Sequence, residues 1–274
     1  MLRSLLSLPS LVSLEPFMKI LFVGDVVGRP GRKLLKDHLS SVQEEHDVDY
    51  TIVNVENAAG GFGITPPLAE EILRYGVDVM TSGNHVWDKR EVFEFLNREP
   101  RLLRPGNYPK GAPGNFVHIG ESRTGTRVAV INLQGRVFMP LTDCPFRLAE
   151  KEVQRIARET RIIVIDFHAE ATSEKMALGW FLDGQVSAII GTHTHIPTAD
   201  WRVLPRGTAY VSDVGMTGPY DSVIGMELDG SLSRFLTGLA ARMEVASENP
   251  RFSAVLLDVD ESTGMARSIR RIEK

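Results

Sequence analysis

The chain has 274 residues, of which 43% are hydrophobic and 24% are charged, and its formal net charge is −4. This composition is that of a globular protein and excludes a largely disordered or collagen-like chain. The small acidic excess argues against a protein whose main function is to coat nucleic acid or an anionic membrane. Because Cys144 is the one cysteine, no internal disulfide can form, and we expect a cytoplasmic protein.

The first 17 residues, MLRSLLSLPSLVSLEPF, differ in pattern from the remainder of the chain. They lack the long apolar core and the small-residue cleavage site of a signal peptide. No run in the sequence approaches the roughly 18 apolar residues that a membrane span needs. We therefore expect residues 1–17 to be an extension outside the fold and residues 18–274 to form a single domain. An ordered extra segment and an export signal are the two alternatives.

Strand and helix patterns alternate over the first hundred residues. Apolar runs typical of buried parallel strands lie at Met18–Gly24, Asp49–Val55 and Val77–Ser82. Apolar residues at helical spacing predict helices at Arg29–Glu45, Pro66–Tyr75 and Lys89–Asn97. This rhythm implies right-handed crossovers and a sheet that is covered by helices.

The second part of the chain begins with short apolar runs separated by Pro, Gly and Asn between Arg101 and Gly135, which indicate a second sheet. Further strands are predicted at Val128–Leu133, Ile162–Phe167, Val186–Gly191, Trp201–Leu204 and Thr208–Val211, with a closing hairpin of Ser253–Asp258 and Ala266–Ile272. Helices are predicted at Phe146–Glu159, Ser173–Leu182 and Leu232–Ala240. The class of fold is therefore α/β.

Residues suited to binding metal ions come directly after five apolar segments. The five sites are Gly24-Asp25, Glu56-Asn57, Gly83-Asn84-His85, Phe167-His168 and Gly191-Thr192-His193-Thr194-His195. Ligand sites of open α/β sheets form outside the carboxyl ends of the strands, so we expect all five at one edge of the molecule. A helix cap or a turn explains any one of them alone. Five such strand ends together favour a functional site.

The chemistry of this set suits Mn, Fe, Co or Zn, because carboxylate, amide and imidazole ligands are combined. The candidate ligands are Asp25, Glu56, Asn57, Asn84, His168, His193 and His195. They are too many for one tetrahedral ion and fit two ions about 3.5–4 Å apart. Pro197 comes shortly afterwards, so we expect His193 and His195 in a loop from which both turn inward.

Six blocks in one order carry a family resemblance. They are KILFVGDVVGRPGR, VNVENAAGGFGIT, SGNHVWD, DFHAEATSEK, IIGTHTHIPTAD and SDVGMTGPYDS, which together span Lys19 to Ser222. This order resembles the calcineurin-like metallophosphoesterases, and most closely their bacterial YmdB-like branch of 2′,3′-cyclic-nucleotide 2′-phosphodiesterases. Unlike the wider superfamily, the first block lacks an Asp-x-His, and the second offers Glu56 and Asn57 instead of an aspartate. Both departures belong to that branch, and they leave one ion with fewer nitrogen donors.

The resemblance implies a four-layer α/β sandwich with two central mixed sheets flanked by helices. It also implies two divalent transition-metal ions per chain, Fe or Mn first and Zn as the alternative. Asp25, Glu56, Asn57 and His195 would surround one ion, while Glu56, Asn84, His168 and His193 would hold the other. His85 would be the catalytic residue that donates a proton to the leaving oxygen after in-line attack by a bridging hydroxide.

Other candidates have weaker support. Gly61, Thr217 and Asp221 are candidate substrate contacts, and Glu170 and Lys175 are candidates for orienting the metal ligands. The expected partner is a small nucleotide substrate, without a stable nucleic-acid complex or a membrane, and a homo-oligomer is compatible with the sequence. Two other functions compete with the phosphodiesterase. One is a non-catalytic or weakly catalytic regulator that binds a nucleotide or a partner protein, and the other is a dinuclear metallohydrolase that acts on C–N bonds.

Overall fold

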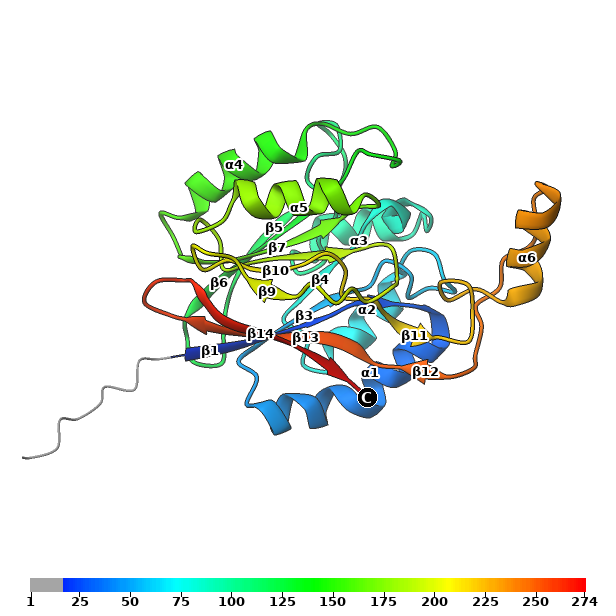
Figure 1. Cartoon of the computed structure of the whole chain (residues 1–274), viewed down its shortest axis with the longest axis horizontal. Helices are drawn as coiled ribbons and strands as arrows, with labels where there is room; N and C mark the ends of the chain where they lie inside the picture. Colours follow the sequence, from blue (N-terminus) through cyan, green and yellow to red (C-terminus); the bar gives the residue numbers. More distant parts are fainter. Residues whose placement is uncertain (1–16) are drawn as a thin grey trace, which may run out of the picture.

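The computed structural model describes residues 17–274 (Figure 1). Residues 1–16, which the sequence predicts to be an extension outside the fold, are not among the described residues. Phe17, which the sequence assigns to the extension, is instead the first residue of a strand and pairs with Asp260. Within residues 17–274, no helix combines the length and the apolar character needed to cross a membrane.

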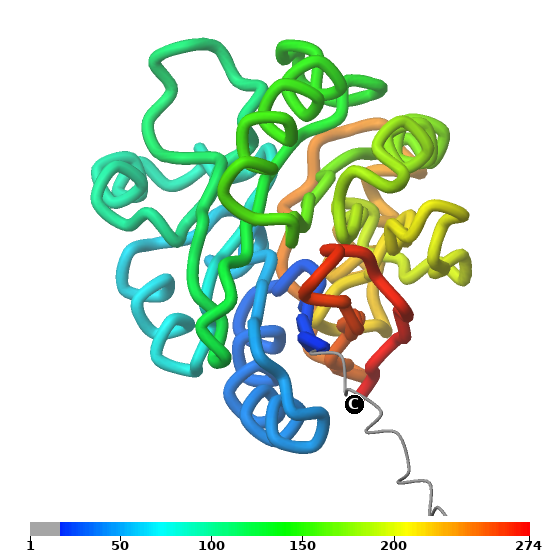
Figure 2. The backbone as a smooth tube through the Cα atoms, turned by 90° about the vertical axis from the view of Figure 1, so that its left-hand side faces the viewer, coloured from blue at the N-terminus to red at the C-terminus, as the bar shows by residue number. Residues whose placement is uncertain are grey.

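A five-stranded mixed sheet contains both ends of the described chain. Its order is β14 (Ala266–Glu273), β13 (Ser253–Asp260), β1 (Phe17–Val23), β3 (Tyr50–Asn54) and β4 (Val79–Thr81). Strands β1, β3 and β4 are parallel, whereas the C-terminal hairpin adds two antiparallel strands beside β1. In Figure 2 the N-terminal strand and the red C-terminal hairpin accordingly lie side by side.

A six-stranded mixed sheet faces the first. Its order is β5 (Val117–Glu121), β6 (Arg127–Gln134), β7 (Ile162–His168), β8 (Ala188–Thr192), β10 (Ala209–Val211) and β9 (Arg202–Val203). Strands β6, β7, β8 and β10 are parallel, and the two edge strands are antiparallel to their neighbours. Buried apolar side chains from both sheets form one shared core between them.

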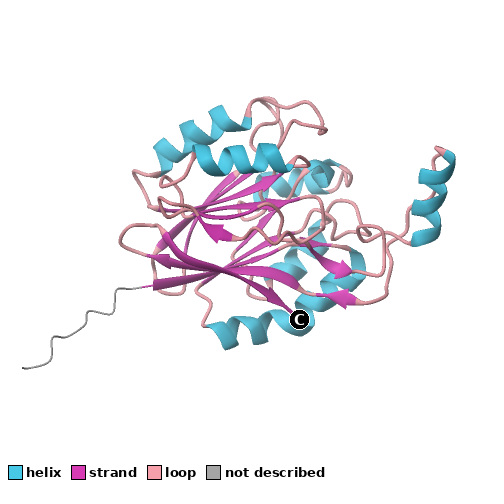
Figure 3. Cartoon of the chain, in the orientation of Figure 1, coloured by secondary structure: helices cyan, strands magenta, loops and turns pink. Residues whose placement is uncertain are grey.

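Helices cover the outer face of each sheet (Figure 3). Those against the five-stranded sheet are α1 (Gly28–His46), α2 (Pro66–Leu73) and α3 (Val92–Arg98), and those against the six-stranded sheet are α4 (Pro145–Ile156) and α5 (Thr172–Phe181). Side chains alternate between the two faces of a strand. In β1, Ile20 and Phe22 therefore join the core between the sheets, while Leu21 and Val23 pack against the helices. The expected four-layer sandwich is confirmed.

Two parts of the fold differ from the sequence prediction. A three-stranded sheet of β12 (Pro250–Arg251), β11 (Met216–Pro219) and β2 (Asp25–Val26) has no counterpart in it. Helix α6 occupies Leu228–Thr237, about one turn earlier than the predicted Leu232–Ala240. It ends at Gly238, whose positive φ of 71° closes the helix. Figure 1 shows α6 standing away from the two sheets.

Candidate metal centre and active site

Strand ends from both sheets meet at one edge of the molecule. Asp25 comes after β1, Glu56 comes after β3, and Asn84 is the first residue of η1 (Asn84–Trp87) after β4. His168 is the last residue of β7, and His193 comes directly after β8. The parallel direction of these strands within each sheet explains this convergence.

The centre of the cluster is formed by Asp25, Glu56 and His168, which offer ligand atoms that all lie within 4.8 Å of one another. His168 Nε2 lies 2.5 Å from Glu56 Oε2 and 3.0 Å from His193 Nδ1. Asp25 Oδ1 lies 4.0 Å from His195 Nε2. Atoms this close and of these types are typical of residues that share a cation.

The tautomer of His168 is set by its hydrogen bonds. Its Nδ1 lies 2.9 Å from Thr192 Oγ1, and the Thr192 hydroxyl donates its own hydrogen to Asp166 Oδ1 over 2.7 Å. The hydroxyl oxygen therefore accepts from His168, whose Nδ1 carries the hydrogen. In the neutral form of His168, the form that can bind a metal, the lone pair of Nε2 faces Glu56 and His193, which is the arrangement found in metal-binding histidines.

The other two histidines are oriented in the same way. His195 Nδ1 donates to the Ile224 carbonyl over 2.7 Å, so its Nε2 lone pair faces Asn57 Oδ1 at 3.2 Å. His193 Nε2 lies 3.1 Å from Glu170 Oε2, which leaves its Nδ1 lone pair facing His168. Three imidazole lone pairs thus point at oxygen atoms or at each other. Lone pairs and oxygen atoms that face one another repel, and a cation bound between them turns this repulsion into attraction.

Buried oxygen atoms without a hydrogen bond support the same conclusion. Ten buried side-chain nitrogen and oxygen atoms of the described residues form no hydrogen bond, and three of them are Asp25 Oδ1, Glu56 Oε2 and Asn84 Oδ1. Each such oxygen costs about 1–3 kcal/mol unless another partner compensates it. All three belong to the predicted ligand set, so the donor atoms fit divalent ions.

The protonation states also suit metal binding. Burial alone raises the pKa of Glu56, but without a metal ion the protonated, positively charged His168 beside it more than offsets this and lowers that pKa to about 2. Burial, together with the nearby His168, lowers the pKa of His193 to about 3. At neutral pH the cluster therefore contains the Glu56 carboxylate and a neutral His193 imidazole.

The segment from His193 to His195 is strained and is held in place by a buried ion pair. His193 has a φ of 100° and His195 a φ of 65°, backbone angles that residues other than glycine rarely adopt. Lys175 Nζ donates to the Thr192 carbonyl over 2.8 Å and to Asp213 Oδ2 over 2.9 Å. Asp213 in turn accepts from the backbone N–H between the two histidines. The two histidines lie in a loop after β8, as the sequence predicts.

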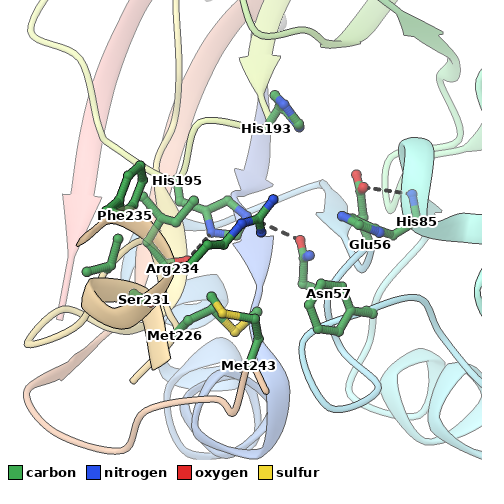
Figure 4. A pocket seen from close by; sticks show the side chains of 13 residues that line it. Glu56, Asn57, His85, His193, His195, Met226, Ser231, Arg234, Phe235 and Met243 are labelled. Carbon is green, nitrogen blue, oxygen red and sulfur yellow. Dashed lines mark hydrogen bonds between the residues drawn. The ribbon is translucent and has the colours of Figure 1, made fainter. Parts of the chain in front are cut away.

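A pocket of about 390 Å³ opens beside the cluster (Figure 4). Its polar end contains Glu56, Asn57, His85, His193 and His195. Its other end is apolar, apart from Ser231 and Arg234. The residues that line this end belong to α6 and to the segments on either side of it. A mostly apolar pocket with a few converging polar groups is typical of a small-molecule site.

His85 lies at the polar end of this pocket. Its Nδ1 is 2.8 Å from Asp88 Oδ2, and its ring packs edge-on against Phe62 with 5.1 Å between the centroids. Its backbone N–H donates to Glu56 Oε1 over 2.9 Å, the contact drawn in Figure 4. The ring is thus fixed beside the cluster while its Nε2 is free to meet a ligand.

The family model described as YmdB-like protein matches residues 21–272. The chain belongs to the YmdB-like family. It is 48% identical over 255 residues to a Bacillus subtilis protein named 2′,3′-cyclic-nucleotide 2′-phosphodiesterase, covering 93% of this chain and 96% of that one.

Two solved structures resemble this YmdB-like chain throughout. A hypothetical protein from Thermus thermophilus is 40% identical with a TM-score of 0.87, and the match covers 94% of this chain and 99% of that one. A structure described as a novel phosphatase from Mycoplasma pneumoniae is 33% identical with a TM-score of 0.90, covering 95% and 94%. The fold of this chain is therefore that of its family.

The three candidate substrate contacts do not line the pocket. The Gly61 carbonyl accepts from Asn57 Nδ2 over 2.9 Å and so orients that amide. Thr217 is buried, where its hydroxyl pairs with the backbone of Ser253. Asp221 accepts from Asn249 Nδ2 at the surface. Each of the three has a hydrogen bond within the fold, and their role as substrate contacts stays a prediction.

Glu170 and Lys175 are predicted from the sequence as orienting residues, but the partner of Lys175 is not. Glu170 bonds His193, and Lys175 reaches Asp213. Asp213, Thr192 and Asp166 do not belong to the candidate ligands. They orient the ligand histidines through the hydrogen bonds described above. Both Thr192 and Asp213 lie within the six sequence blocks, but their residue types alone give no signal.

Gly83 gives the first testable prediction. A Cβ atom at this position would overlap Glu56 Oε2 and the His168 ring. We expect Gly83→Ala to weaken metal binding by at least about 10- to 100-fold, the usual effect of disturbing the support of a metal ligand. The dissociation constant for Mn²⁺ measures this effect. Gly111→Ala, where the added Cβ meets nothing within 4 Å but the φ of 96° strains the backbone, is the control for strain away from the cluster and should bind Mn²⁺ normally. Equal binding by both variants would contradict the placement of the cluster.

Proposed function

We propose that this phosphoesterase is a metal-dependent phosphodiesterase that opens 2′,3′-cyclic nucleotides at the 2′ oxygen. The observation that carries the proposal is the set of three histidine lone pairs directed at the cluster of buried oxygen atoms. The name of the Bacillus subtilis relative supports the choice of substrate. The expectation of a cytoplasmic enzyme with a small nucleotide as substrate belongs to the same proposal.

The ligand residues fall into two groups that share Glu56. One group is Asp25, Glu56, Asn57 and His195, and the other is Glu56, Asn84, His168 and His193. Divalent ions such as Mn or Fe, when bound there, supply positive charge that neutralises the phosphate and lowers the pKa of a bound water. Zn is the alternative metal.

The remaining groups act on the substrate directly. Water that has released a proton to solvent attacks phosphorus as hydroxide and forms a new P–O bond, while the bond from phosphorus to O2′ breaks. The departing O2′ needs a proton, and His85 donates it from Nε2, because Asp88 engages Nδ1. The product is a nucleoside 3′-phosphate with a free 2′ hydroxyl. The position of His85 in the pocket favours this enzyme over a purely regulatory nucleotide-binding protein.

The experiment is a product assay on the purified protein. With Mn²⁺ present, 2′,3′-cyclic AMP should be converted to adenosine 3′-phosphate, and chelator should stop the reaction until Mn²⁺ is restored. Chromatography separates the 3′-phosphate from the 2′-phosphate. Formation of the 2′-phosphate, or no turnover by protein that contains bound metal, would contradict the proposal.

A further inference from the structure

Helix α6 contributes residues to the wall of the pocket (Figure 4). The helix stands away from the two sheets (Figure 1) and contributes little to the core. Ser231 is the one buried residue among its ten. Phe235 is 79% exposed and Leu236 is 83% exposed. A helix with so little burial is not explained by packing alone, so its contribution to the pocket is the feature to explain.

The base of α6 is tied to the metal centre. The segment before the helix accepts the hydrogen bond of His195 through the Ile224 carbonyl. Two backbone bonds join this segment to the one that returns from the helix, from Glu227 to Glu244 and from Ala246 to Gly225. The position of the helix is therefore fixed relative to His195.

Arg234 is the residue of α6 that reaches the polar end. Figure 4 shows its side chain extending from the helix across the pocket toward His195 and Asn57. Within residues 17–274 it is the one arginine or lysine that lines this pocket, and it forms none of the ion pairs. A guanidinium pairs with two phosphate oxygens at once, which makes it suited to this class of ligand.

The apolar wall lies beside this arginine. Ile224, Met226, Met243 and Phe235 line it. Methionine side chains adapt to flat ligands, and an aromatic ring stacks on any nucleobase. A nucleotide combines the two properties that the pocket offers, an anionic phosphate and a flat base.

We propose that α6 is the substrate-recognition element of the enzyme. Arg234 pairs with the non-bridging oxygens of the phosphate, and Phe235 with the apolar wall packs against the base. The inference rests on the proposed function, because it takes a cyclic nucleotide as the substrate. One exposed helix would then recognise both the phosphate and the base of the nucleotide.

The phosphate contact is tested with Arg234→Ala, Arg234→Lys and the control Arg242→Ala. Arg242 is an exposed arginine near α6 whose partner is Glu244, and it does not line the pocket. We expect Arg234→Ala to raise KM for 2′,3′-cyclic AMP about 10- to 100-fold, with a smaller change in kcat, because a charged hydrogen-bonded pair is lost. Arg234→Lys should lie between the alanine variant and the wild type. Metal content should be unchanged in all three.

The base contact is tested with Phe235→Ala against Leu236→Ala, since Leu236 is similarly exposed but does not line the pocket. Loss of stacking should raise KM for 2′,3′-cyclic AMP about fivefold or more in Phe235→Ala alone. With glycerol 1,2-cyclic phosphate, which has no flat group that could stack, the two variants should be alike. Equal KM values for the cyclic nucleotide in both would contradict the contact.

A binding measurement separates this inference from the proposed function. If the wild type does not hydrolyse 2′,3′-cyclic AMP, the proposed function fails. Calorimetric titration of the Mn²⁺-loaded protein with adenosine 3′-phosphate then still reports on the helix. Weaker binding by Arg234→Ala than by Arg242→Ala supports the inference. Equal binding by these two variants, or no binding by the wild type, overturns it.

Discussion

Glu56→Gln is expected to abolish phosphodiesterase activity together with metal binding. Glu56 is the carboxylate that both proposed ion sites share, and its Oε2 is buried beside His168 with no hydrogen bond. The neutral amide keeps the shape of the side chain but removes its negative charge. We expect a loss of activity of about 10³-fold or more, since metal ions supply several kcal/mol of transition-state stabilisation.

The controls for this variant separate metal loss from misfolding. Elemental analysis should find less metal in Glu56→Gln, whereas Glu70→Gln, at an exposed carboxylate paired with Arg74, should match the wild type. Asn84→Ala removes an amide oxygen that has no hydrogen-bond partner, so it should weaken metal binding without lowering the melting temperature of the metal-free protein. Full metal content in both Glu56→Gln and Asn84→Ala would show that the cluster is not the metal site.

His85→Ala is expected to lower turnover by about 10²- to 10⁴-fold while metal content stays at the wild-type level. The His85 ring lines the pocket and bonds Asp88, and the contact with Glu56 comes from the backbone, which alanine retains. The variant therefore removes the proton donor and leaves the support of Glu56 in place. Steady-state kinetics with 2′,3′-cyclic AMP measures the effect, and His46→Ala, on the last turn of α1, is the matched control.

The leaving group distinguishes a proton donor from a structural residue. p-Nitrophenolate leaves without protonation, whereas the 2′ oxygen of ribose does not. His85→Ala should therefore lose much less activity on bis(p-nitrophenyl) phosphate than on the cyclic nucleotide. An equal loss on both substrates would contradict the role of His85 as general acid and would favour a role in binding.

The strand ends of the site were predictable because each is a short apolar run that stops at a polar residue. The sequence predicts β7 up to Phe167, and the structure continues it to His168, the ligand itself. Parallel pairing of β1 with β3 then brings Asp25 and Glu56 to one edge, and the packing of the two sheets against each other adds His168 from β7. The hydrogen bonds that orient these ligands were not predictable, since the role of Thr192 depends on which way its hydroxyl points.

The same physical reasons explain the errors in the fold. The strands of the three-stranded sheet have two to four residues, too few to show a periodic pattern. In α6 the apolar residues Leu232, Phe235 and Leu236 are exposed, so their spacing does not mark a buried face or the ends of the helix. For this reason Arg234 could not be recognised as a pocket residue from the sequence.

Anomalous diffraction from crystals of the Mn²⁺-loaded protein tests the central claim most directly. Two peaks should appear in the cluster, one among Asp25, Asn57 and His195 and the other among Asn84, His168 and His193, with Glu56 between them. A single peak, or peaks elsewhere in the molecule, would contradict a two-ion centre built from these residues.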